Sequence, residues 1–347
     1  MQGLRIAGFA PIDWVGAVFS TPLISLVLAM IAVGGYVAFS RPPRPALTVL
    51  SGAAGRSVNK RYAPERHALA IAALAVAAVF AAEDIVRGSG LVGDGAVPWW
   101  RFAIPVVSST LAIGFLVVVI MLRGSGPAEA PVVTGARRTW TSFGPRVGLI
   151  LWGVVFLLLV ATTIGAGLTS AADDRGQYRW LEIPIPNEAA VDPIRLGYYG
   201  WAFGLPVLIA VAALLVTTAI ALRRNAARPF IRPETVAAER GLRADVASGA
   251  VAVSTAGMLL AMAGAWRLIA RAGSPAQLWI QGRNGGEPYE AAWRYAELAT
   301  VAGWGAPVLE LIAFGLLFVV TARLGRKRPS SPDEHRAELA DAARAGR

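Results

Sequence analysis

The chain has 347 residues, of which 55% are hydrophobic and only 16% are charged, and its formal net charge is +11. Soluble chains carry about 25% charged residues, so this composition indicates a membrane protein, and its positive charge calls for no nucleic-acid partner. The absence of cysteine excludes disulfides, a thiolate nucleophile and thiolate metal ligands.

Seven apolar segments are each near the ~20 residues that a helix needs to cross a bilayer. They lie at residues 15–39, 67–86, 102–122, 147–169, 200–222, 247–270 and 299–322. We therefore predict an all-α, polytopic membrane helix bundle with seven transmembrane helices. Its predicted parts are an N-terminal anchor span (1–39), a basic loop (40–66), three helical hairpins (67–122, 147–222 and 247–322) and a polar tail (323–347).

Basic and acidic residues collect on opposite sides of the predicted bundle. Arginine and lysine follow the first, third, fifth and seventh spans, whereas the acids gather in the intervening loops. The positive-inside rule then predicts an outside N-terminus and a cytoplasmic C-terminus, in the plasma (inner) membrane. We expect the basic cytoplasmic loops to contact anionic lipid headgroups.

Prolines recur at equal intervals near the outer ends of the three returning helices, as Pro105, Pro206 and Pro307. We interpret this spacing as a threefold repeat of one hairpin, in which each proline kinks its helix. The outer loops at 170–199 and 271–298 contain YRWLEIPIP and QLWIQGR, which have the form of short strands. We expect these two loops to pack on each other as a small outer cap.

Glu310 is the one charge inside the last span. The free energy of placing a carboxylate at the centre of a bilayer is at least ~2.5 kcal/mol on insertion scales. The presence of Glu310 therefore needs an explanation, either a partner that offsets this cost or a function. Ser254 and Thr255 of the sixth span lie at a similar depth if the two helices are antiparallel. Two interpretations stay open: a protonated Glu310 bonded to a hydroxyl, or a role in proton- or cation-linked transport.

A second candidate site lies at the outer face. Glu83 and Asp84 end the second span, and Arg267 stands near the outer end of the sixth. Glu83 and Asp84 could form an interfacial ion pair with Arg87, or have a solute or proton role. Arg267 could pair with Glu290 or Glu297, or its long side chain could reach the surface. Trp201 and Trp304 belong to a group of tryptophans concentrated on this side, beyond what two aromatic belts would give.

Chemistry-bearing motifs are scarce. His67 lies at the edge of a span and His335 in the tail, which excludes a bis-histidine haem, and Lys60 and Lys327 lie outside the spans, which excludes a retinal Schiff base. No Walker A, zincin or nucleophile-elbow motif occurs. We predict no cofactor, no metal site and no catalytic residue.

For function, the sequence leads us to predict a non-enzymatic interaction or assembly component that contacts other membrane subunits through its outer loops. The single central charge and the aromatic outer surface favour this class. One alternative is a small-solute or ion transporter coupled through Glu310, favoured by the repeat and the aligned prolines. The other is an intramembrane enzyme, which lacks a base and nucleophile within reach of each other.

Overall fold

The computed structural model describes residues 21–39, 53–88, 97–123, 139, 141–185, 192–275, 277–279 and 287–325. Several predicted segments lie wholly or partly outside the described residues. They are the start of the anchor span (1–20), most of the basic loop (40–52), parts of the two outer loops (186–191 and 280–286) and the tail from residue 326.

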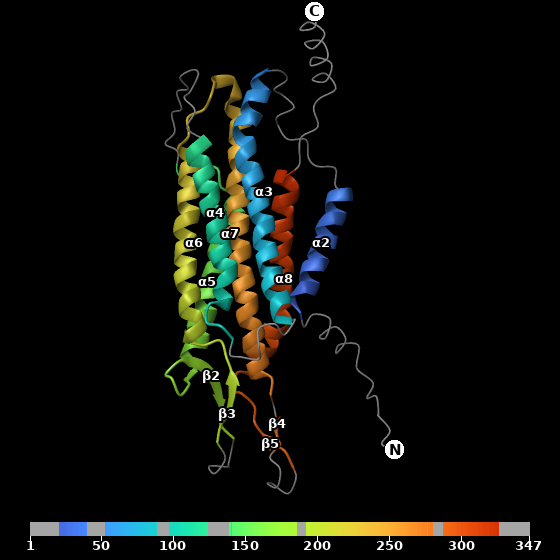
Figure 1. Ribbon diagram of the computed structural model, residues 1–347, viewed down its shortest axis with the longest axis vertical. Coiled ribbons are helices and arrows are strands. Elements are labelled where there is room, and N and C mark those ends of the chain that lie inside the picture. Colours follow the sequence, from blue (N-terminus) through green and yellow to red (C-terminus); the bar gives the residue numbers. More distant parts are fainter. Residues whose placement is uncertain are drawn as a thin grey trace, which may run out of the picture.

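Within the described residues, seven helices are long and apolar enough to cross a membrane, as predicted, and they make the chain a multi-pass membrane protein (Figure 1). They are α2 (Pro22–Phe39), α3 (Ala53–Gly88), α4 (Ile104–Arg123), α5 (Arg146–Leu168), α6 (Trp201–Ala227), α7 (Val236–Gly273) and α8 (Ala296–Gly325). Two short 3-10 helices, η2 (Arg101–Ala103) and η3 (Pro233–Thr235), precede α4 and α7. Which membrane the bundle occupies, and which side each end faces, stay predictions.

Helix α7 is the centre of the bundle. Of its apolar stretch 89% is buried, against 11% in α2 and in α5, which lie at the periphery. It contacts α3, α4, α5, α6 and α8, and each predicted hairpin pairs its own two helices (α3 with α4, α5 with α6, α7 with α8). Small residues on α7, among them Gly249, Gly257 and Ala261, let these neighbours approach closely.

The closest approach on α7 gives a direct test of this packing. A Cβ added at Gly257 would lie 2.3 Å from Ser109 Oγ and 2.9 Å from the Pro105 carbonyl oxygen, both on α4. Because the backbone of α4 would have to move, we expect Gly257→Ala to lower the free energy of unfolding by about 1–3 kcal/mol. The measurement is unfolding in mixed detergent micelles.

Gly315→Ala on α8 is the matched control, since no heavy atom lies within 4 Å of its added Cβ. Alanine has the higher helix propensity, so this variant should equal the parent or gain up to about 1 kcal/mol. Equal costs for the two substitutions would contradict the close contact between α4 and α7.

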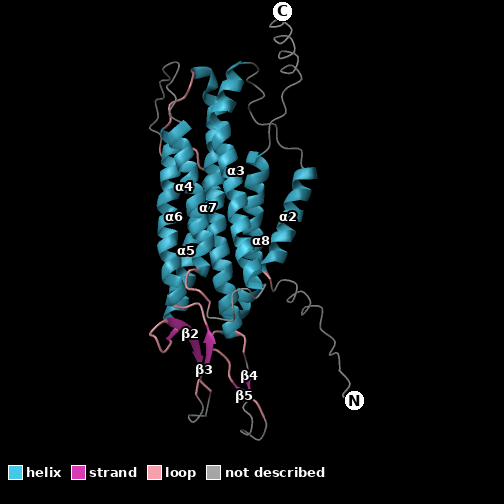
Figure 2. Cartoon of the chain, viewed as in Figure 1, coloured by secondary structure: helices cyan, strands magenta, loops and turns pink. Residues whose placement is uncertain are grey.

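The short strands of the described residues lie at one end of the bundle, which we name the strand end (Figure 2). Strands β1 (Ala171–Ala172), β2 (Tyr178–Ile183) and β3 (Ile194–Gly197) form an antiparallel sheet, and β4 (Gln277–Leu278) pairs with β5 (Tyr289–Glu290). Both predicted strand segments thus contain strand. Their role as an outer cap stays a prediction.

An aromatic contact links the two strand-bearing loops where they meet the helices. The rings of Tyr198 and Trp293 pack edge to face with centroids 5.8 Å apart. The neighbouring Tyr199 is fully buried against Phe102, and this burial raises the pKa of its phenol. Aromatic packing therefore anchors the strand end to α4 and α6.

The three aligned prolines do not share one structural role. Pro206 and Pro307 lie inside α6 and α8, but Pro105 is in the first turn of α4. A proline there removes an N–H group that has no partner within the helix and causes no kink. The expectation of three matching kinks is therefore wrong for α4, and the repeat itself stays a prediction.

Candidate functional site

Glu310 pairs with Arg267 inside the bundle. Arg267 Nε lies 2.6 Å from Glu310 Oε1, and its Nη2 lies 2.7 Å from Oε2, so both ends of the carboxylate are bound. Glu310 is 1% exposed and Arg267 15%. This two-point geometry is the strong form of an arginine–carboxylate pair, and it joins α7 to α8 through residues far apart in the chain.

The predicted hydroxyl partners of Glu310 are engaged elsewhere. Ser254 Oγ accepts a hydrogen bond from Trp152 Nε1 at 2.8 Å and lies 3.3 Å from Thr218 Oγ1. Thr255 donates to the carbonyl of Val251, one turn earlier in its own helix. The expectation of a Glu310–hydroxyl bond is therefore wrong. The depth estimate assumed that equal distances from the outer ends of α7 and α8 are level, whereas Arg267, six residues before the end of α7, pairs with Glu310, fourteen residues after the start of α8.

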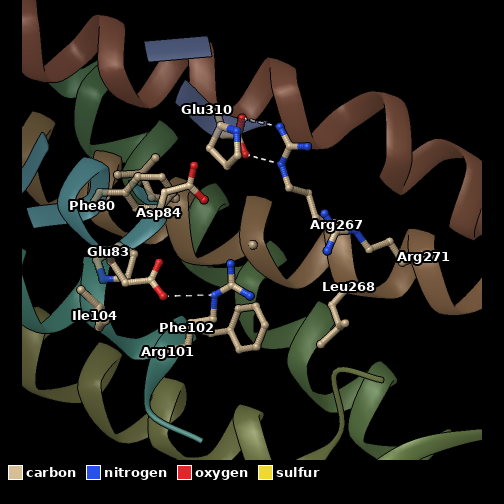
Figure 3. Close-up of a pocket in the computed structure, with 14 residues that line it drawn as sticks. Phe80, Glu83, Asp84, Arg101, Phe102, Ile104, Arg267, Leu268, Arg271 and Glu310 are labelled. Atoms are coloured by element: carbon tan, nitrogen blue, oxygen red, sulfur yellow. Dashed lines mark hydrogen bonds and ion pairs between the residues drawn. The ribbon is translucent and has the colours of Figure 1, made fainter. Parts of the chain in front are cut away.

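The Arg267–Glu310 pair lines a pocket of about 80 Å³ near the strand end (Figure 3). The wall also contains Glu83 and Asp84 from α3 and Arg101 from η2. Apolar side chains from four helices complete it: Phe80, Ile104, Leu260, Leu268 and the ring of Pro22. The pocket thus combines several ionisable groups with an apolar wall, as small-molecule sites do.

A second ion pair lies across the pocket from the first. Arg101 Nε is 3.4 Å from Glu83 Oε1, and both side chains are partly exposed. Figure 3 shows this pair and the Arg267–Glu310 pair on different sides of the pocket, with the Asp84 carboxylate near both. Glu83, Asp84 and Arg267, which were predicted as an outer-face site, are therefore brought together with Glu310.

Two further charges line the same pocket without an ion pair. The Asp84 carboxylate is half-buried, and Arg271 is exposed one turn beyond Arg267 on α7. Neither side chain forms a hydrogen bond or an ion pair with any residue in the described ranges. Asp84 and Arg271 thus line one pocket without a hydrogen bond or ion pair to a described residue, although Arg101 and Arg267 lie close enough to Asp84 to interact with it electrostatically.

The two predicted tryptophans lie outside this pocket. Trp201 packs against Gly167 of α5, where an added Cβ would lie 2.4 Å from its ring. Trp304 is half exposed on α8. Both fit the ordinary role of tryptophan near a membrane surface.

A second charged cluster, which we name the clasp, lies at the opposite end of the bundle. It consists of Tyr62, Glu65, Arg228, Glu239 and Arg243, all of them buried. Arg228 donates from Nη1 and Nη2 to the two carboxylate oxygens of Glu65, each at 2.7 Å. The cluster links α3 to α7 and to the segment that joins α6 with α7.

Arg243 is the centre of the clasp and is fully buried. It donates to Tyr62 Oη at 2.9 Å, to the Arg228 carbonyl at 2.9 Å and to the Pro229 carbonyl at 3.0 Å. Its guanidinium also lies 4.3 Å from the centroid of the Phe230 ring. Such a guanidinium keeps its charge inside the protein because hydrogen bonds replace water.

Glu239 supplies the negative charge opposite Arg243. Its carboxylate accepts from Tyr62 Oη at 3.0 Å, from Ile231 N at 2.8 Å and from Thr235 Oγ1 at 2.8 Å. Since its charges are paired and hydrogen-bonded, the clasp is a structural joint. Its members Glu65 of α3 and Glu239 of α7 lie in the polar parts of these helices that precede the predicted spans.

The sequence prediction missed Arg101, Phe80 and Phe102 of the pocket and the whole clasp. One signal could have found the charged members. Arg101 and Arg267 lie on the acid-rich side of the bundle, and Glu65 and Glu239 lie on the basic side. A charge on the side of the bundle where the opposite sign prevails departs from the positive-inside rule and indicates a specific partner. Each of these four residues forms an ion pair.

Within the described ranges, no three histidine, aspartate or glutamate side chains are grouped as a metal site requires. Comparisons of the chain with protein-family models, with curated proteins and with solved structures give no match. The site's own geometry is therefore the basis for a functional proposal.

Proposed function

We propose that this chain is a permease that moves a small polar solute across the membrane and binds it in the pocket beside the Arg267–Glu310 pair. The observation that carries the proposal is this ion pair, buried in the wall of a pocket inside a membrane bundle. Ionisable groups within a membrane are costly, and they mark solute and ion pathways more often than they serve as scaffold.

The arrangement of the two ends supports this proposal. The pocket lies near the strand end, whereas at the opposite end the clasp ties α3 to α7 through the hydrogen bonds of Tyr62, and to the segment after α6 through the Arg228–Glu65 ion pair. A site near one end of a bundle whose other end is held together fits one state of an alternating-access cycle. With the predicted orientation, the strand end faces outside and this state is outward-facing.

The other functional classes have less support. Catalysis needs a nucleophile and a base in mutual reach, and the described part of the pocket wall contains no hydroxyl, imidazole or amine side chain. An assembly role stays a prediction, because the exposed apolar residues of α2 and α5 are those that lipid would cover in any membrane protein.

Solute flux into proteoliposomes tests the proposal. With glycine, acetate, ethylammonium and glycerol as solutes, we expect the protein to accelerate the swelling of shrunken vesicles at least tenfold for one of them. Glu310→Gln should return that rate to the protein-free value, because the paired charge is lost. Swelling is followed by light scattering in a stopped-flow instrument.

Glu297→Gln is the control, since Glu297 is exposed at the start of the same helix. It should retain the parent rate at equal protein density in the vesicles. The proposal fails if no solute enters faster than in empty vesicles, or if Glu310→Gln transports as well as the parent.

A further inference from the structure

We infer that the pocket binds a short zwitterion, with one ammonium group held by Asp84 and one carboxylate held by Arg271. This inference rests on the proposed function and names the solute class. Its basis is the balance of charge in the pocket wall. Arg267 forms its close ion pair with Glu310 and Arg101 with Glu83, which leaves Asp84 and Arg271 as the two charges of the wall without a close ion pair to a described residue.

A ligand with charges of both signs satisfies both remaining groups at once. A simple anion would pair with Arg271 and add a second negative charge beside the half-buried Asp84 carboxylate, and a simple cation would pair with Asp84 and leave the exposed Arg271 to water. Burying an unmatched charge under a ligand costs free energy, since the water that solvated it is displaced. Both charges of a zwitterion are matched, so it enters without this cost.

The size of the pocket limits the ligand to a short one. Each water-sized group needs about 10–15 Å³ of such volume, so about 80 Å³ holds roughly five to eight non-hydrogen atoms. Phe80, Ile104 and Leu268 form the apolar part of the wall, which suits methylene groups between the two charges. The expected class is thus a short, unbranched amino acid of the size of glycine, β-alanine or 4-aminobutanoate.

Isothermal titration calorimetry on the full chain in lipid nanodiscs tests this inference. The probes are glycine, β-alanine and 4-aminobutanoate, with acetate and ethylammonium as comparators that carry a single charge. We expect at least one zwitterion to bind at least tenfold more tightly than either comparator. Comparators that bind as tightly, or the absence of binding by all three zwitterions, would overturn the inference.

Two variants test the assigned residues. Asp84→Asn and Arg271→Gln should each weaken zwitterion binding roughly tenfold to a hundredfold, as expected for loss of a charged hydrogen-bond partner. Neither removes a protein ion pair, so both should unfold at the parent temperature. Asp174→Asn and Arg175→Gln, exposed together near the strand end, are the controls and should bind normally. Unchanged affinity in either pocket variant would overturn the assignment.

The outcomes separate this inference from the proposed function. Zwitterion binding without solute flux would keep the ligand assignment and end the permease proposal. Flux of glycerol, acetate or ethylammonium that depends on Glu310, with no zwitterion binding, would keep the permease and end this inference.

Discussion

Replacement of Glu65 by alanine is expected to lower the free energy of unfolding by about 3–5 kcal/mol. The variant leaves the Arg228 guanidinium, 5% exposed, without the carboxylate that binds it through two hydrogen bonds of 2.7 Å. An unmatched charge in a buried site is the costly part of breaking such a pair. The measurement is titration of the purified protein with sodium dodecyl sulfate in mixed micelles.

An exposed pair of the same chemistry is the matched control. Arg195 and Glu182 lie 2.9 Å apart across β3 and β2, with 55% and 36% of their side chains exposed. Water solvates both ions when the pair is broken, so Glu182→Ala should cost less than about 1 kcal/mol. Equal costs for Glu65→Ala and Glu182→Ala would contradict a desolvated clasp.

The double variant Glu65→Ala/Arg228→Ala gives the second check. Since it removes both charges, it should be more stable than Glu65→Ala alone, although the lost packing of Arg228 on Tyr62 keeps it below the parent. A double variant less stable than the single one would mean that the clasp acts through packing and not through charge.

The existence of the helices could be predicted from the sequence, because a run of apolar residues long enough to cross a bilayer has few other interpretations. The residues at which the helices begin and end could not be predicted. The segments 53–66 and 236–246 are rich in charge, which excluded them from the predicted spans, yet both are helical. The tertiary contacts of the clasp satisfy three of these charges, Glu65, Glu239 and Arg243, and a hydropathy window does not register such contacts.

The partner of Glu310 shows a second limit. Depth could be inferred from helix length, and it pointed to Ser254 and Thr255. The rotation of each helix could not be inferred, because α8 is apolar on all sides and carries no polar stripe that indicates which face meets α7. The offset between the two helices along the bundle, together with this unknown rotation, was enough to miss Arg267.

The pair at the pocket is expected to show a strong asymmetry between its two single variants. Glu310→Gln leaves a guanidinium that stays charged at any accessible pH, so it should cost about 3–5 kcal/mol of stability. Arg267→Gln should cost less, because the remaining carboxyl group can take up a proton and become neutral. Both values come from the same detergent titration.

The double variant Arg267→Gln/Glu310→Gln then separates scaffold from function. With both charges replaced by amides of similar size, its stability should return to within about 1 kcal/mol of the parent, because no unmatched ion remains between α7 and α8. Solute flux should stay lost, since the amides cannot replace the charges that border the pocket. A double variant that recovers stability and flux together would mean that the pair only joins the two helices, and that solute passes without it.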